Sequence, residues 1–197
     1  GYTAFASSFA MFATGRAWEQ IRNSVAYPRL DVKIAGSHSG ISVGEDGATH
    51  QATEDIALMR VIPDMEVFVP CDAAETKAVV QYAAASGKPC YIRLGRSKVE
   101  DVYSADEQFD LKKVHVLRRG TGTVVFACGL MVQEALQAAE ILAAEGIEIT
   151  VADVCSIKPA DEDGIAALLA EHDTVITCEE HSVIGGLGSP GGGLAPA

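Results

Sequence analysis

The 197-residue sequence predicts an α/β protein built from two small three-layer domains with mainly parallel sheets. Apolar runs typical of buried strands alternate with amphipathic helical segments, and this order favours parallel β-α-β units. A charged, aperiodic stretch over residues 97–120 interrupts the alternation, which then resumes. Hydrophobic residues make up 48% of the chain, enough for a buried core. We therefore expect a first domain over residues 1–103, a linker over 104–120 and a second domain over 121–197.

The first domain is predicted to contain four strands and three helices. The first helix has an apolar face and ends before Pro28, which disfavours its continuation. Thr53 can cap the second helix, while Asp72 and Gly87 are typical of the start and the stop of the third. The predicted strands are residues 2–6, 30–37, 66–71 and 88–95, and the predicted helices are residues 11–27, 53–62 and 72–86.

The second domain repeats the alternation without a break. Its apolar runs predict strands, and the segments between them have helical periodicity. The strands are expected over residues 122–129, 147–154 and 173–180, and the helices over residues 131–146 and 159–172.

Charge and composition exclude several classes of protein. The formal net charge is −12 and the isoelectric point is near 4.7, so we expect no nucleic-acid partner. No apolar run approaches the roughly 20 residues that span a bilayer, and no signal peptide is visible, so we expect no membrane association. The five cysteines are odd in number and widely spaced, which indicates reduced, buried thiols in a cytoplasmic protein.

Both ends of the sequence suggest a piece of a larger polypeptide. The chain begins with "GYTAFASSFAMFATG", without an initiator Met and already inside structured-looking sequence. It finishes with the Gly/Pro-rich run "GGLGSPGGGLAPA".

The stretch "HSGISVGEDGATHQ" is the candidate functional loop. It directly follows a predicted strand, and ligands of open α/β sheets bind at the carboxyl ends of strands. Histidine is the side-chain type suited to proton transfer at neutral pH, so His38 and His50 are candidates for that role, and Asp46 can accept hydrogen bonds. Arg96 leaves another predicted strand and can bind a phosphate in a bidentate manner. This set suits a phosphorylated, polyhydroxylated substrate.

Each of these features also has a structural interpretation. The loop can be a simple turn with surface histidines, and Arg96 can be a solvated ion-pair partner. Phe5, Phe9 and Phe12 have the default role of core aromatics. A metal site on His38 and His50 is disfavoured because no further ligand lies at helical spacing, so no metal ligands are predicted in this chain.

At the level of whole motifs, the sequence resembles the transketolase family. Residues 1–100 resemble its pyrimidine-binding domain, with "SSFAMFATG" and the specific motif "GEDGATHQ". The second half, through "EEHSVIGGLGS", resembles the family's C-terminal domain. The variant most resembled is the small subunit of split transketolases, in which the enzyme is divided over two chains.

The resemblance implies transfer of a two-carbon ketol unit between sugar phosphates, with thiamine diphosphate and Mg²⁺ as cofactors. It implies that Phe9 and Phe12 pack on the aminopyrimidine ring, and that a further family aromatic falls near Gly15, which leaves that wall thinner. By the same resemblance, His38, Asp46 and His50 contact the sugar, and both histidines can move protons. Arg96 matches the arginine that grips the substrate phosphate, and Arg93 is a second, weaker candidate.

Two family features are absent from this sequence. The glutamate that hydrogen-bonds the cofactor ring lies before the segment matched by "SSFA", and no G-D-G motif with a downstream Asn occurs. We therefore expect this chain to be inactive alone, with Mg²⁺ held mainly by a diphosphate-binding transketolase subunit or domain as its partner. A homodimer or a heterotetramer is expected.

Two alternatives stay open at this point. One is a fragment of a 1-deoxy-D-xylulose-5-phosphate synthase-like enzyme, which has a similar loop; a dehydrogenase beta subunit fits less well. The other is a non-catalytic assembly or regulatory module, against which the intact set of His38, Asp46, His50 and Arg96 argues.

Overall fold

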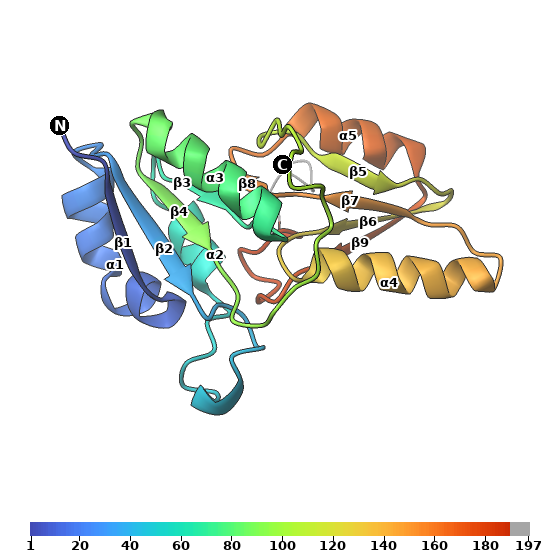
Figure 1. Cartoon of the computed structure of the whole chain (residues 1–197), viewed down its shortest axis with the longest axis horizontal. Helices are drawn as coiled ribbons and strands as arrows, with labels where there is room; N and C mark the ends of the chain where they lie inside the picture. Colours follow the sequence, from blue (N-terminus) through green and yellow to red (C-terminus); the bar gives the residue numbers. More distant parts are fainter. Residues whose placement is uncertain (190–197) are drawn as a thin grey trace.

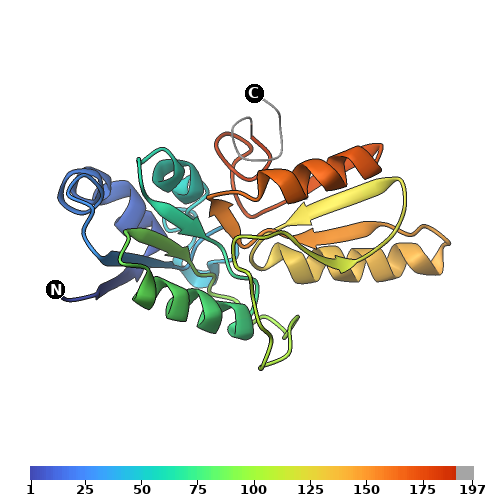
Figure 2. The same ribbon diagram turned by 90° about the horizontal axis from the view of Figure 1, so that it is seen from above.

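The computed structural model describes residues 1–189 and contains two mainly parallel sheets, each with helices on both faces (Figures 1 and 2). The first sheet has the strand order β1-β2-β4-β3-β8 and the second has the order β5-β7-β6-β9. The predicted α/β fold class is confirmed.

The first sheet has four parallel strands that come from the first part of the chain. They are, in spatial order, β1 (Ala4–Phe9), β2 (Val32–Ser37), β4 (Cys90–Arg93) and β3 (Glu66–Phe68). Since the strands are parallel, their carboxyl ends meet at one edge of the sheet. Phe9 pairs there with Ser37, which brings the residues that follow β1 and β2 together.

Helices cover both faces of this sheet. A helical segment made of η1 (Met11–Arg16), α1 (Trp18–Gln20) and η2 (Ile21–Ala26) lies with α2 (Asp55–Arg60) on one face, and α3 (Ala73–Ser86) lies on the other (Figure 2). The segments η1 and η2 are π-helical. The predicted ends of α3 are confirmed, because Asp72 Oδ1 accepts a hydrogen bond from Glu75 N at 2.8 Å and Gly87 is left-handed with φ 65°. The cap of α2 was predicted wrongly: Glu54, and not Thr53, occupies the N-cap position.

The second sheet is also sandwiched between helices. It contains β5 (His115–Arg118), β7 (Thr150–Asp153), β6 (Thr123–Ala127) and β9 (Thr174–Cys178), with β5 antiparallel to β7. On one face α4 (Met131–Ala144) packs with Val132, Ala135 and Ala139 inward, and on the other face α5 (Glu162–Glu171) buries Ile165 and Leu168.

Two short strands depart from the predicted division of the chain. β5 lies inside the segment 104–120, which the sequence predicts as a linker, and it extends the second sheet. β8 (Ser156–Lys158) follows β7 of the second sheet but pairs antiparallel with β3 of the first. The two sheets also share a buried cluster that includes Ile56 and Tyr91 from the first half and Phe126 and Ile165 from the second. The boundaries at 103 and 121 stay predictions.

The structure also bears on the expected membrane segments, cysteines and C-terminal tail. Within residues 1–189, no helix combines the length and the apolar character that crossing a bilayer requires. All five cysteines are free, and all except the half-buried Cys178 are buried. The end of the Gly/Pro-rich tail, residues 190–197, lies outside the described residues.

Candidate active site

Four of the predicted site residues form one aromatic cluster at the carboxyl edge of the first sheet. Phe9 ends β1, Phe12 lies one turn further on in η1, and their rings are parallel within 5° with centroids 6.0 Å apart. The ring of His38, which follows β2, stacks on Phe9 with centroids 4.0 Å apart. The ring of His50 meets Phe12 edge-on at 5.2 Å and Phe9 at 5.8 Å. The fold therefore unites residues that are distant in the sequence, through neighbouring parallel strand ends.

In both histidines of this cluster, the ring nitrogen Nδ1 hydrogen-bonds to a neighbouring hydroxyl group. His38 Nδ1 lies 3.0 Å from Ser37 Oγ, and His50 Nδ1 lies 2.9 Å from Thr49 Oγ1. Neither Nε2 atom has a hydrogen-bond partner within residues 1–189, so each can contact a substrate hydroxyl or carbonyl. His38 also has a φ of 56°, a left-handed conformation that is uncommon for a residue with a side chain.

Asp46 and Arg96 lie apart from the rings, beside the glycine-rich part of the loop. Asp46 ends the short helix η3 (Gly44–Asp46) and is exposed. Arg96 Nη1 lies 3.2 Å from the position that a Cβ on Gly44 would take, and this side chain is also exposed. Within the described residues, neither charged group has a hydrogen bond or an ion pair. Both are thus available to an incoming polar ligand.

Arg93 has a different environment from Arg96. It is buried and pairs with Asp55, with Nε 2.8 Å from Oδ2 and Nη2 3.1 Å from Oδ1. Nη2 also donates to the carbonyls of Ala52 and Glu180. Burial lowers the pKa of the Arg93 guanidinium and the Asp55 carboxylate raises it by more, so the pKa lies above its ordinary value. Because its donors serve protein acceptors, Arg93 supports the base of the loop, and its role as a second phosphate ligand stays a prediction.

Arg16 is a candidate site residue that the sequence did not single out. Its guanidinium carbon lies 4.5 Å from the centroid of the Phe12 ring, within cation–π range. Gly15, where an aromatic was expected, has no side chain to cover that ring. Arg16 is the next residue in the sequence. Its flat guanidinium group beside Gly15 is the signal that could have identified it.

Comparison with known proteins now adds to this geometry. Residues 1–101 match the family model described as transketolase, pyrimidine binding domain, and residues 112–190 match the model described as transketolase, C-terminal domain. The chain belongs to the transketolase family. The match covers both halves of the chain, as the loop motif and the "EEHSVIGGLGS" motif indicated.

Individual transketolase relatives are similar over nearly the whole chain. A putative transketolase C-terminal section of Methanocaldococcus jannaschii is 48% identical, over 95% of this chain and 59% of its own length. A 6-deoxy-6-sulfo-D-fructose transketolase subunit of a Clostridium species is 42% identical, over 96% of this chain and 59% of its own length. A solved structure described as a split gene transketolase, inactive beta4 tetramer, superposes with a TM-score of 0.87 at 51% identity, over 95% of this chain and 60% of that one. This chain thus spans about three-fifths of the length of these relatives.

The aromatic cluster fits one part of the cofactor that the transketolase family implies. A flat aminopyrimidine ring stacks favourably on aromatic faces such as those of Phe9 and Phe12. Residues that could hold a diphosphate and Mg²⁺ are not part of this aromatic cluster. In the described part of the chain, the one group of three metal-ligand-type side chains is Cys71, Glu75 and Asp153, which are all buried. This group joins the two halves of the chain and does not belong to the aromatic cluster.

That second cluster contains a buried carboxyl pair. Glu75 Oε2 accepts from Cys71 N at 2.8 Å, and Asp153 Oδ2 accepts from Tyr103 Oη at 2.7 Å. The other oxygens, Glu75 Oε1 and Asp153 Oδ1, are buried without a hydrogen-bond partner within residues 1–189. Burial and the nearby Asp153 charge raise the pKa of Glu75 to about 9, and burial raises the pKa of Asp153 to about 6. The pair therefore retains a proton at neutral pH, which can satisfy the oxygens left over.

Proposed function

We propose that this chain carries the pyrimidine-binding and C-terminal parts of a transketolase, which transfers a two-carbon ketol unit between sugar phosphates. The observation that carries the proposal is the cluster of Phe9, Phe12, His38 and His50, in which both histidines keep Nε2 free. A surface turn with incidental histidines does not require two rings to pack on two phenylalanines.

Each site residue has a role that follows from its chemistry. Thiamine diphosphate, when bound, supplies the nucleophilic carbon that takes up the two-carbon unit. Phe9 and Phe12 offer apolar faces on which its pyrimidine ring can pack, and Arg16 backs the Phe12 ring. His38 and His50 can donate hydrogen bonds through Nε2 to substrate oxygens and can accept or return a proton there. They are the proposed catalytic residues of this chain.

The two exposed charges complete the substrate contacts in this proposal. Asp46 accepts hydrogen bonds from sugar hydroxyls, and Arg96 binds the terminal phosphate. An arginine is needed for that task because the chain as a whole has a net charge of −12, which repels an anionic substrate.

We further propose that activity requires a diphosphate-binding transketolase subunit or domain, which holds Mg²⁺ and completes the cofactor site. The absence of a G-D-G motif from this sequence supports this division. The relatives named as a C-terminal section and as a subunit support it too. An assembly of two or more protomers follows if cofactor sites lie between chains. The free thiols support the expected cytoplasmic location.

Reconstitution tests the proposal. Calorimetry with thiamine diphosphate and Mg²⁺ is run on this chain alone and on a mixture with the diphosphate-binding subunit of a split transketolase. Ketol transfer from a ketose phosphate to an aldose phosphate is then assayed in the mixture. We expect no heat of binding for the chain alone, and binding together with transfer in the mixture. The subunit used must be one that is active with its own cognate partner. If the mixture with this subunit shows no binding and no transfer, the proposal is overturned.

A matched pair of variants links the activity to the cluster. His50→Gln removes the proposed proton carrier, and we expect it to lower kcat by about 100-fold or more. His115→Gln is the control, because His115 is a similarly half-buried histidine on β5 whose Nε2 lies 3.0 Å from the Asp110 carbonyl. Equal losses in the two variants would contradict the assignment.

A further inference from the structure

The loop of residues 38–51 is held at its base by a carboxylate from the other half of the chain. Glu180 follows β9 and is buried. Its Oε1 accepts hydrogen bonds from two consecutive backbone amides, Ser42 N at 3.0 Å and Ile41 N at 3.3 Å. Gly40 has a φ of 79°, and a Cβ added there would lie 2.7 Å from Glu180 Cβ. The loop backbone therefore closes directly onto this side chain.

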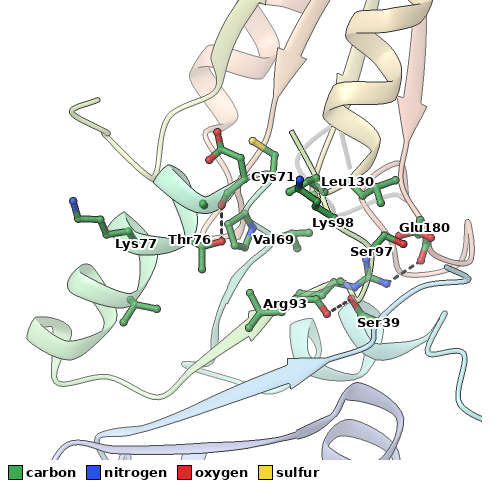
Figure 3. Close-up of a pocket in the computed structure, with 18 of the residues that line it drawn as sticks. Ser39, Val69, Cys71, Thr76, Lys77, Arg93, Ser97, Lys98, Leu130 and Glu180 are labelled. Carbon is green, nitrogen blue, oxygen red and sulfur yellow. Dashed lines mark hydrogen bonds between the residues drawn. The ribbon is translucent and has the colours of Figure 1, made fainter. Parts of the chain in front are cut away.

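The same residue is tied to the far end of the loop through Arg93. The Arg93 guanidinium donates to the Glu180 carbonyl at 2.8 Å and to the Ala52 carbonyl at 3.2 Å, as Figure 3 shows for the Arg93–Glu180 contact. Gly40 N donates to the Ala52 carbonyl at 2.8 Å, which closes the loop across its base. Asp55 fixes the guanidinium from behind. Both ends of the loop thus meet at one buried network.

The segment of residues 41–42 has few other side-chain anchors. Ser97 Oγ donates to the Ser42 carbonyl at 3.4 Å, and Gln51 Nε2 donates to the Ile41 carbonyl at 2.9 Å. The Glu180 carboxylate is the one charged group in the described chain that binds amides of this loop. Hydrogen bonds to a charged acceptor are about twice as strong as neutral ones, and two convergent amides fix the direction of the backbone.

We infer that Glu180 is a positioning residue of the active site, by which the C-terminal domain sets the loop that carries His38, Asp46 and His50. The inference rests on the proposed transketolase function for its effect on catalysis. Within the described residues Glu180 has no ion-pair partner. Its negative charge is therefore stabilised by hydrogen bonds from the loop amides. Loss of this acceptor frees the amides of residues 41–42, which lie between His38 and Asp46.

Glu179 provides a matched control. It is the neighbouring residue with the same side chain, and it also accepts from two backbone amides, Leu187 N at 2.7 Å and Gly188 N at 3.2 Å. Those amides belong to a different segment. The two glutamates therefore accept the same kind of hydrogen bond, but from two separate loops. Glu179→Ala is expected to loosen residues 186–188 and to leave the loop of residues 38–51 unchanged.

Hydrogen exchange and kinetics of the reconstituted enzyme test the inference together. Glu180→Ala is expected to raise amide exchange of Ile41 and Ser42 while β6 stays protected, and to lower kcat by about 10- to 100-fold with little change in the KM for the ketose phosphate. Glu180→Gln keeps the acceptor oxygen and is expected to restore most of kcat. Glu180→Asp keeps the charge, but its side chain is one methylene shorter and cannot reach the two amides. We therefore expect that it does not restore kcat.

The outcomes separate the two claims. Unchanged exchange of the loop in Glu180→Ala, or equal effects of Glu179→Ala on the loop, would overturn the positioning role. A loosened loop with unchanged kcat would overturn it as well. If the wild-type mixture transfers no ketol unit, the proposed function fails, and the exchange experiment still decides whether Glu180 holds the loop.

Discussion

The buried pair of Glu75 and Asp153 should make the protein less stable as the pH rises. In the unfolded chain both carboxyls are ionised at about pH 6 and above. In the folded chain, burial raises both pKa values, and the pair keeps one proton until the pH approaches about 9. A group whose pKa is raised on folding stabilises the protein at low pH, and that stabilisation is lost as the pH rises. One retained proton corresponds to a loss of about 1.4 kcal/mol in the free energy of unfolding per pH unit.

Glu75→Gln removes this proton without removing the hydrogen bonds. In the variant, the side-chain carbonyl at this position can still accept from Cys71 N, and the side-chain amide can take the donor role toward Asp153 that a protonated carboxyl would have. Between about pH 6 and pH 8 the wild type should lose about 3 kcal/mol relative to the variant from this pair. Urea unfolding of both proteins at fixed chain concentration, at several values of pH, measures the difference. Contributions of the histidines are common to both proteins and cancel. Parallel curves for wild type and variant would show that the pair carries no extra proton.

Two further predictions concern the loop and the phosphate contact. Gly40→Ala should cost about 3 kcal/mol or more in the free energy of unfolding, since it adds a close contact to a left-handed backbone. Gly87→Ala, at a left-handed glycine with φ 65°, ψ 10° and open space around it, should cost only about 1 kcal/mol. Urea unfolding compares the two variants, and equal costs would contradict the close packing at Gly40. Arg96→Leu should raise the KM for a phosphorylated acceptor about 10- to 100-fold and leave the KM for its unphosphorylated counterpart unchanged, as steady-state kinetics would show; equal changes for both acceptors would refute phosphate binding.

Local chemistry made much of the fold predictable. The ends of α3 follow from a carboxylate that caps the first turn and a glycine that adopts a left-handed φ, and both signals lie within a few residues of the helix. β5 and β8 were not predicted, because strands of 4 and 3 residues carry too short an apolar pattern. Their existence depends on partners, β7 and β3, that only the folded chain supplies.

The site shows the same division between local and tertiary information. The loop motif and its resemblance to the transketolase family identified the histidines that the structure unites with Phe9 and Phe12. The sequence ranked Arg96 above Arg93 by the family resemblance alone, because their positions near one strand end give no measure of burial. The Asp55 partner of Arg93 lies 38 residues away, and that contact gives the two arginines different environments.

The crossing of β8 has a consequence for how the protein is made. Val67 pairs with Lys158, so the first sheet receives its last strand from residues that leave the ribosome long after β3. Until then the edge of β3 is open, and an open strand edge is a template for pairing with another chain. Proteolytic separation of the two halves would expose the same strand edge in the folded protein.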